Sequence, residues 1–277
     1  MIIHFSCGAT SAIAGALALK SCPDAEIIYA DTGAEHEDNK RFLTDCERVL
    51  FKKKVTVLKH PDYVDLFDLF EKKEFLSGVR GAPCTTILKK ETIRDYLGIR
   101  LLEEDHVYGY DTGEMERIDT YKKNNPEIKM ILPLIEHHLS KANCLALLQR
   151  FDIELPAMYK LGYEHSNCIG CVKGGQSYWQ AIKEDFPDVF DWFANHERKI
   201  GAKLEDGSRK GAAINKTNRG GERQRLFLDQ WPEGIKAKRD VEISCGYSCG
   251  MVGDVIAGRK DVEDIADVDS VFGWMNK

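Results

Sequence analysis

The chain has 277 residues, of which 43% are hydrophobic, and a net charge of −6. This length allows one large domain, or one domain with an appendage, around a full hydrophobic core. The negative charge argues against a general nucleic-acid coat protein, although it is compatible with a local basic face. No segment resembles a signal peptide, and the apolar segment 11–19 is too short to cross a bilayer. We therefore expect a cytoplasmic protein with no membrane partner, whose nine cysteines serve metal binding or catalysis rather than disulfides.

The chain opens with a predicted strand, a turn of small residues and a helix. The strand IIHFS ends at Ser6, and the helix runs from Ser11, its expected N-cap, to Lys20. Such a turn directs backbone N–H groups and a helix dipole at a phosphate, although it is also the tight turn of any α/β domain. The candidate phosphate-binding residues are Ser6, Cys7, Gly8, Ala9, Thr10 and Ser11.

A second predicted strand, EIIYA, ends in Asp31-Thr32-Gly33. Polar residues at the carboxyl end of a parallel strand lie where open α/β sheets bind ligands, so we expect adenosine near Asp31. A helix over 37–51, a strand over 54–59 and a helix over 64–73 follow. This alternation predicts an α/β fold with a parallel sheet, right-handed crossovers and helices on both faces.

Two further predicted helices carry candidate site residues, one thiol and two cations. Cys84 lies at the expected start of a helix over 85–97, where the dipole would lower the pKa of its thiol. Lys89, one turn along, either faces a cluster or phosphate or is simply solvated. A strand over 106–110 leads to a helix on which Arg117 either reaches a phosphate or sulfate or pairs with Glu114. Ser140 is expected to cap a helix that ends at Arg150.

The spacing of Cys168 and Cys171 allows two thiolates to bind one metal ion or one cluster corner, and it is equally typical of redox dithiols and zinc knuckles. The distant Cys84, Cys245 and Cys249 could join them. An aromatic helical segment over 176–200, which Pro187 either kinks or splits in two, is expected to serve packing.

Residues 197–225 contain nine Lys or Arg against four acids, with interspersed glycines. This composition predicts an exposed flexible insertion, or alternatively a clamp on phosphates or nucleic acid. Residues 226–228 are expected to return as a strand. We divide the chain into a nucleotide-binding domain, 1–160, and a cluster-binding C-terminal subdomain, 161–277.

Several motifs, in order, resemble the phosphoadenosine/adenosine phosphosulfate reductase family, which has the adenine nucleotide α-hydrolase-like (ATP-pyrophosphatase) fold. Residues 6–12 resemble its phosphate loop, 31–33 its DTG and 84–89 its CxxxLK. Gly109 and Arg117 resemble the GxR region, 133–134 the PL before a helix, and LPAMYKLGY the segment before CxxC. The resemblance covers residues 1 to about 175 and the tail cysteines.

The iron–sulfur branch of that family implies a 4Fe–4S cluster on Cys84, Cys168 and Cys171. Thr85 replaces one cysteine of the family's CC pair, so the fourth ligand is Cys249, our preference, or Cys245. The rival is structural zinc on Cys168, Cys171, Cys245 and Cys249.

The resemblance also implies thiol-dependent reduction of an adenylyl sulfate. Cys245, which keeps the CG of the family's tail, would be the nucleophile, Lys89 and Arg117 would neutralise the sulfate, and a thioredoxin-like protein would be the reductant. The adenine nucleotide is ATP or an adenylyl sulfate. Sulfur transfer to, or modification of, a nucleic acid is one alternative, and a non-catalytic nucleotide sensor is another.

Overall fold

The computed structural model describes residues 1–78, 81–166, 168–201, 204, 210–214, 216–219, 222–239 and 256–258, with the backbone alone at 216–219 and 222–225. Its centre is a five-stranded sheet in which every pair of neighbouring strands is parallel, as predicted. The order is β3-β2-β1-β4-β5. The strands are β1 (Ile2–His4), β2 (Glu26–Ala30), β3 (Thr56–Leu58), β4 (Asp105–Val107) and β5 (Lys129–Ile131).

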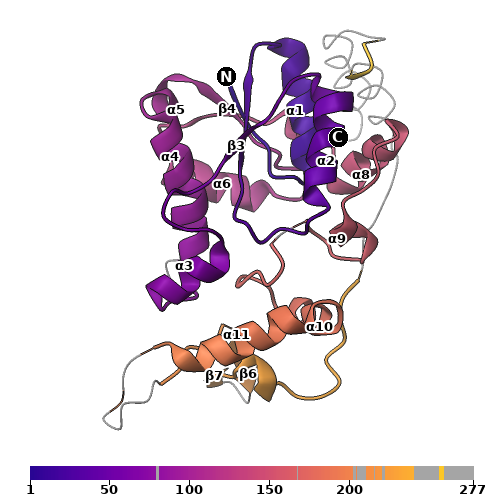
Figure 1. Cartoon of the computed structure of the whole chain (residues 1–277). Coiled ribbons are helices and arrows are strands. Elements are labelled where there is room, and N and C mark those ends of the chain that lie inside the picture. The colour runs from indigo at the N-terminus through magenta and orange to yellow at the C-terminus, as the bar shows by residue number, and fades with distance from the viewer. Residues whose placement is uncertain are drawn as a thin grey trace, which may run out of the picture.

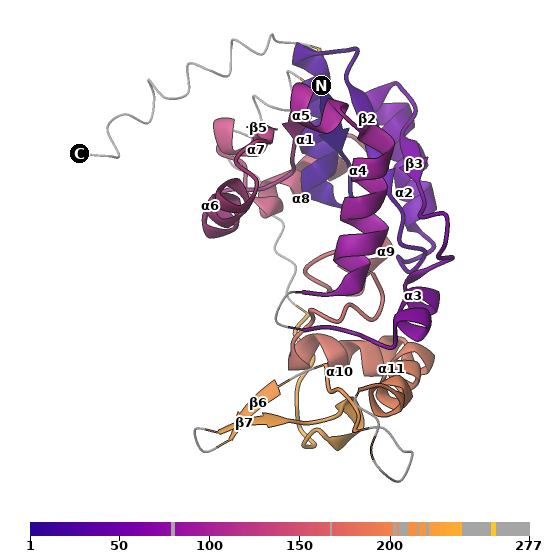
Figure 2. The same cartoon turned by 90° about the vertical axis from the view of Figure 1, so that its left-hand side faces the viewer.

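Helices cover both faces of this sheet, also as predicted (Figures 1 and 2). Alternate strand residues point to opposite faces, so Ile3 and Ile27 join one core cluster and Ile2 and Ile28 another. The first face is covered by α1 (Ala9–Ser21), α2 (Asn39–Cys46), α7 (Pro133–Glu136) and α8 (Lys141–Arg150). The second is covered by α4 (Thr92–Leu97) and α5 (Arg100–Glu103).

The remaining elements lie mostly beyond the carboxyl ends of the strands, where Figure 1 shows α10, α11 and the hairpin of β6 and β7 below the sheet. They are α3 (Leu66–Lys73), α6 (Met115–Asn124), α9 (Ala157–Lys160), α10 (Gln176–Asp185), α11 (Pro187–Lys199), β6 (Lys216–Arg219) and β7 (Glu222–Arg225). Two π-helical segments, Glu47–Phe51 and Cys84–Glu91, and a 3-10 turn, Leu228–Gln230, complete the set.

A further hydrophobic cluster, besides the two on the faces of the sheet, joins α3 to α10 and α11. It contains Phe70 together with Trp179 and Phe193, each with 0% of its surface exposed, which confirms that the aromatic segment serves packing. This cluster contains residues from both sides of residue 160, where we placed the domain boundary. The boundary itself stays a prediction.

Three local predictions need correction. The first helix begins at Ala9 with Gly8 as its N-cap, because the Ser11 hydroxyl bonds within the preceding loop instead. The helix predicted over 37–51 is α2 followed by a π-helical segment. The segment 226–228 forms no strand, since Leu228 begins a 3-10 turn that packs on α11.

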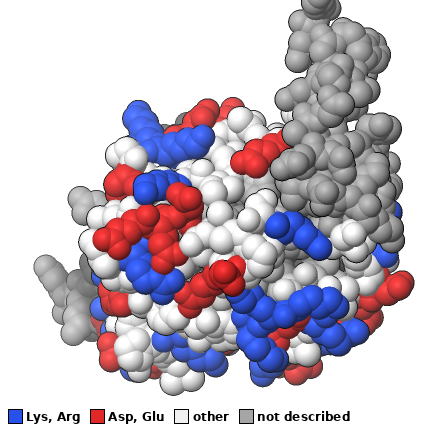
Figure 3. Space-filling model, turned by 90° about the horizontal axis from the view of Figure 1, so that it is seen from above, with Lys and Arg blue, Asp and Glu red and all other residues white. Residues whose placement is uncertain are grey.

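The surface carries both charge signs. In Figure 3, which views the molecule from the end opposite α10 and α11, acidic and basic side chains are mixed, with one edge where Lys and Arg predominate. Within the described ranges, no helix combines the length and the apolar character needed to cross a bilayer.

Candidate functional site

A cavity of about 320 Å³ opens at the carboxyl ends of β1 and β4. The strand order reverses between these two strands, and such a switch point is where open α/β sheets bind ligands. Of the predicted site residues, the cavity is lined by Ser6, Gly8, Thr10, Ser11, Lys89, Gly109, Arg117 and Cys168.

The loop before α1 is closed by its own hydroxyl groups. The Ser6 N–H donates to Ser11 Oγ at 3.1 Å, and Ser11 Oγ donates to the Gly8 carbonyl at 3.0 Å. Cys7 adopts a left-handed conformation (φ 54°) that is uncommon for residues other than glycine. The whole residue is fully buried and is not among those that line the cavity, and burial raises the pKa of its thiol. The Ala9 N–H already donates to the Tyr159 hydroxyl at 3.4 Å.

Gly109 lets the end of β4 approach this loop. A Cβ atom at position 109 would lie 2.6 Å from both the backbone N and the Cα of Ser11. Real Cβ atoms do not come this close to backbone, so glycine is required for the contact. The absence of a side chain at Gly109 therefore lets the segment after β4 pack directly against the start of α1.

The Asp31-Thr32-Gly33 turn packs beside the cavity rather than among its lining residues. Asp31 forms an ion pair with Lys59 at 3.2 Å and accepts a hydrogen bond from the Gly33 N–H at 2.8 Å. Thr32 Oγ1 lies 3.0 Å from the Cys168 sulfur. The turn thus contributes to the site through the position of Cys168.

A thiol, a carboxylate and an ammonium group meet at one end of the cavity. The Cys168 thiol is 3.5 Å from Glu35 Oε1, and Lys89 Nζ is 4.0 Å from the same oxygen. Burial, reinforced by Glu35, raises the pKa of Cys168. Burial lowers the pKa of Lys89, but Cys168, Glu35 and the other two thiols outweigh it, so the net pKa is raised and Lys89 stays charged. Sequence reasoning missed Glu35, although it stands two residues after Gly33.

Tyr178 organises the loop that carries the CxxC motif. Its hydroxyl accepts hydrogen bonds from the N–H groups of Gly170 (3.0 Å) and Cys171 (2.9 Å) and donates to the Cys168 carbonyl (2.9 Å). The prediction treated Tyr178 as packing alone, because a hydroxyl that bonds across a loop leaves no periodic pattern in the sequence.

Cys84, Cys168 and Cys171 lie close enough for their charges to interact. The predicted lowering of the Cys84 pKa is wrong: Cys84 begins the π-helical segment, but burial and the neighbouring Cys171 raise the pKa of its thiol. Three thiols suit iron or zinc chemically. Within the described ranges, however, no three His, Cys, Asp or Glu side chains are placed to hold one metal ion. Cys245 and Cys249 lie outside the described residues.

Arg117 pairs with Glu114, which confirms one of the two interpretations offered for it, while contact with a phosphate or sulfate stays a prediction. Its guanidinium lies over the Tyr110 ring, 5.0 Å from the ring centre. It also lines the cavity, at the end of β4 and the start of α6.

Two histidines, both missed by sequence reasoning, fix each other's tautomers below the cavity. His106 Nε2 lies 3.0 Å from the Leu101 carbonyl, which can only accept, so this nitrogen carries hydrogen. His106 Nδ1 then accepts from His4 Nε2 at 2.8 Å, which leaves His4 Nδ1 as an acceptor. Burial, with a smaller effect of His106, lowers the pKa of His4 to about 3, so the cavity-lining imidazole of His4 is neutral.

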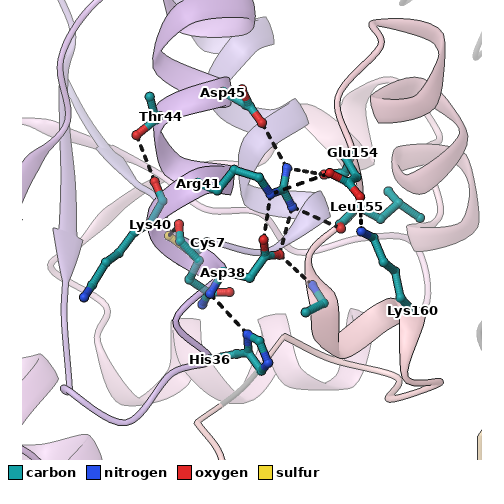
Figure 4. A network of polar contacts seen from close by, with 12 residues as sticks. Cys7, His36, Asp38, Lys40, Arg41, Thr44, Asp45, Glu154, Leu155 and Lys160 are labelled. Atoms are coloured by element: carbon teal, nitrogen blue, oxygen red, sulfur yellow. Dashed lines mark hydrogen bonds and ion pairs between the residues drawn. The ribbon is translucent and has the colours of Figure 1, made fainter.

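Contacts from α2 hold the start of α9, which contributes Tyr159 to the cavity. Arg41 bonds Asp38 at 2.6 Å and the Leu155 carbonyl at 3.2 Å, and Asp38 Oδ2 accepts from the Ala157 N–H at 2.8 Å, as Figure 4 shows. Ala157 is the first residue of α9, which carries Tyr159 into the cavity. Two further cavity residues on this side, Lys141 and His165, were also missed.

The parallel sheet, with a cavity at its switch point, has the α/β, adenine nucleotide α-hydrolase-like fold. The phosphoadenosine phosphosulfate reductase domain matches residues 1–176. The chain belongs to this family. Over 202 residues it is 23% identical to an uncharacterized protein of Methanocaldococcus jannaschii, covering 71% of this chain and 47% of that relative. The chain thus spans about half the length of the relative that it matches.

Proposed function

We propose that the protein binds an adenine nucleotide in the cavity and carries out thiol-dependent reduction of an adenylyl sulfate. One observation carries the proposal. The phosphate loop, the Lys89 ammonium and the Cys168 thiol all line the same cavity, next to the charged Arg117. An adenylyl sulfate bound in the cavity would place its phosphate at the loop 6–11 and its sulfate near Lys89.

The chemistry balances with thiols alone. A cysteine thiolate, proposed to be Cys245, attacks the sulfur of the adenylyl sulfate, and the bond from sulfur to the phosphate oxygen breaks. AMP, or its 3′-phosphate derivative, leaves with the bonding electrons, and an S-sulfonate remains on the cysteine. A second thiol attacks that cysteine sulfur, which releases sulfite and forms a disulfide, and a thioredoxin-like dithiol reduces the disulfide. Lys89 and Arg117 would offset the charge of the sulfate oxygens.

We further propose that Cys84, Cys168 and Cys171, with Cys249, hold a 4Fe–4S cluster. A bound cluster would supply fixed charge beside the sulfate, and no step above depends on it. Anaerobic purification tests the proposal: brown protein containing iron and inorganic sulfide supports it, and colourless protein with one zinc ion supports the Cys₄ zinc site. An unchanged metal content in Cys84→Ala would remove Cys84 from the ligands.

Calorimetry with ATP, adenylyl sulfate and GTP on anaerobically purified protein tests the nucleotide. We expect an adenine nucleotide to bind and GTP to bind more weakly. If no adenine nucleotide binds, or GTP binds equally well, the proposed function fails. Release of sulfite from adenylyl sulfate with a dithiol reductant then tests the reaction, and tight binding without any product would support the sensor.

A second candidate, action on a nucleic acid, is favoured by the β6–β7 hairpin. This antiparallel pair is built from the basic segment, and its register sets Lys216 opposite Arg225. Figure 2 shows the hairpin projecting from the part of the molecule below the sheet. Salt-sensitive RNA or DNA binding that disappears when Arg219, Arg223 and Arg225 become Ala would support this candidate.

A further inference from the structure

We propose that Lys141, held in place by His165, forms an oxyanion subsite that binds the same phosphate group as the loop 6–11. The inference rests on the proposed function, because it takes the cavity to be the nucleotide site. Lys141 Nζ lies 2.8 Å from His165 Nδ1, and both residues line the cavity. An ammonium group has only donors, so His165 Nδ1 accepts and its ring is neutral. The pair therefore carries one positive charge, at a fixed position.

The charge balance of the cavity singles out Lys141. Lys89 faces the Glu35 carboxylate, and Arg117 is paired with Glu114. For Lys141, no carboxylate oxygen lies within 4.0 Å in the part of the chain that the structure describes, so its charge has no direct counter-ion there. Burial lowers the pKa of Lys141, and Glu164, Asp111 and Glu114 oppose this effect from a distance. An anion entering the cavity would find this cation unpaired.

The place of Lys141 in the fold is locally unfavourable. It is the first residue of α8, directly after the N-cap Ser140. A cation there opposes the helix dipole, which favours acids in the first turn. A residue that breaks a local rule in this way is typical of a functional position.

Lys141 also lies beside Tyr159, which contacts the loop 6–11. Its Nζ is 5.8 Å from the centre of the Tyr159 ring, and the Tyr159 hydroxyl accepts from the Ala9 N–H at the start of α1. The start of α1 and Lys141 thus flank Tyr159. A phosphate or sulfate oxyanion fits this chemistry. Because the loop is expected to take the phosphate next to the ribose, AMP and adenylyl sulfate should depend on Lys141 equally.

The test is calorimetry with adenosine, AMP and adenylyl sulfate on the full chain, comparing wild type with Lys141→Met. We expect AMP and adenylyl sulfate each to bind about 10- to 100-fold more weakly to the variant, as for a lost hydrogen bond to a charged group, with adenosine unchanged. Lys160→Met is the matched control, because Lys160 is paired with Glu154 on the surface; it should change no affinity more than about twofold. Lys141→Arg, which keeps the charge, should retain most of the AMP affinity.

Other outcomes overturn the inference in distinguishable ways. Unchanged AMP binding in Lys141→Met refutes the subsite, and a loss seen only with adenylyl sulfate places Lys141 at the sulfate instead. An equal loss for adenosine shows a structural role. If Lys141→Met does not fold, Lys141→Gln replaces it in the same comparison. If wild-type protein binds neither adenosine nor AMP, the proposed function itself has failed.

Discussion

Two glycines at the phosphate loop differ in what the fold demands of them. At Gly109 an added Cβ would meet the Ser11 backbone at 2.6 Å, whereas at Gly8 the nearest atoms, the hydroxyl oxygens of Tyr159 and Ser6, are 3.5 and 3.6 Å away. Gly8 also has extended backbone angles (φ −113°, ψ 160°) that any residue can adopt. Gly109 is therefore a requirement of folding, and the space beside Gly8 is left for a ligand.

We expect Gly8→Val and Gly109→Ala to separate binding from stability. Gly8→Val should change the free energy of unfolding by less than about 1 kcal/mol and abolish nucleotide binding, because its side chain extends toward cavity-lining atoms. Gly109→Ala should cost about 1–3 kcal/mol, since β4 must move away from α1. Urea denaturation and calorimetry measure both effects. Equal destabilisation by the two variants would contradict this assignment.

Helices and strands could be predicted from the sequence where the contacts that define them join residues close together in the chain. The Ser140 cap was predicted from its own residue type, and the structure shows the reciprocal capping box with Asn143. The parallel pairing of the strands followed from the alternation of strands and helices, whereas the strand order was not predicted. The break before α11 followed from Pro187.

The parts that sequence reasoning missed depend on contacts between distant segments. Glu35 and Lys89 meet Cys168 only after folding, as Lys141 meets His165, and no periodicity marks such pairs. The N-cap assigned to Ser11 failed for a different, local reason, because the Ser11 hydroxyl bonds to Ser6 and Gly8 within the loop. The candidate phosphate loop was identified because its chemistry is contained in consecutive residues.

Glu197 organises the chain that follows α11. Its side chain is fully buried and accepts hydrogen bonds from the Ile214 N–H (2.5 Å) and the Leu228 N–H (2.7 Å), on either side of the hairpin. Burial raises its pKa to about 7, despite these two bonds. A single carboxylate therefore fixes both ends of the segment that carries β6 and β7.

Glu197→Ala should destabilise this segment by about 2–5 kcal/mol, because two backbone donors lose their acceptor. Hydrogen exchange should show lost protection at the Ile214 and Leu228 amides, while amides in α1 keep theirs. Glu197→Gln, with one remaining acceptor oxygen, should lie between wild type and Glu197→Ala. The exposed Glu116→Ala is the control, and protection unchanged by Glu197→Ala would refute the anchoring role.

For the whole molecule, histidines whose pKa is lowered by the fold, two of them buried, set the response to acid. Burial is the leading cause of a lowered pKa at His4, His106, His137, His165 and His196. The unfolded chain therefore binds more protons than the folded chain below about pH 6.5, and their contribution to stability is lost as pH falls. Glu197 acts in the opposite sense, because its raised pKa gives a contribution that is lost as pH rises from about 4.5 to 7.

We expect the free energy of unfolding to rise between pH 5 and 7, by at most about 1.4 kcal/mol per pH unit for each histidine that titrates only when unfolded. Urea denaturation at several pH values measures this slope. His4→Gln should reduce it and Glu197→Gln should increase it. A slope of the opposite sign would show that carboxylates with raised pKa values, such as Glu197, dominate over the histidines.

Arg239 fixes the chain shortly before the tail cysteines. Its guanidinium bonds the Leu161 carbonyl (2.8 Å), Asp185 (2.7 Å) and Glu184 (2.9 Å), just ahead of the CxxC loop. Cys245 follows Arg239 by six residues and Cys249 by ten, so even fully extended chain limits their reach to about 20 and 35 Å from this anchor. On the proposed function, in which Cys245 is the nucleophile, this anchor would limit how far that thiol can move from the CxxC loop. Arg239→Ala should slow sulfite release while nucleotide affinity stays the same, and Arg198→Ala, which breaks an ion pair on α11, should not. If Arg239→Ala releases sulfite as fast as wild type, the reaction does not depend on the Arg239 contacts.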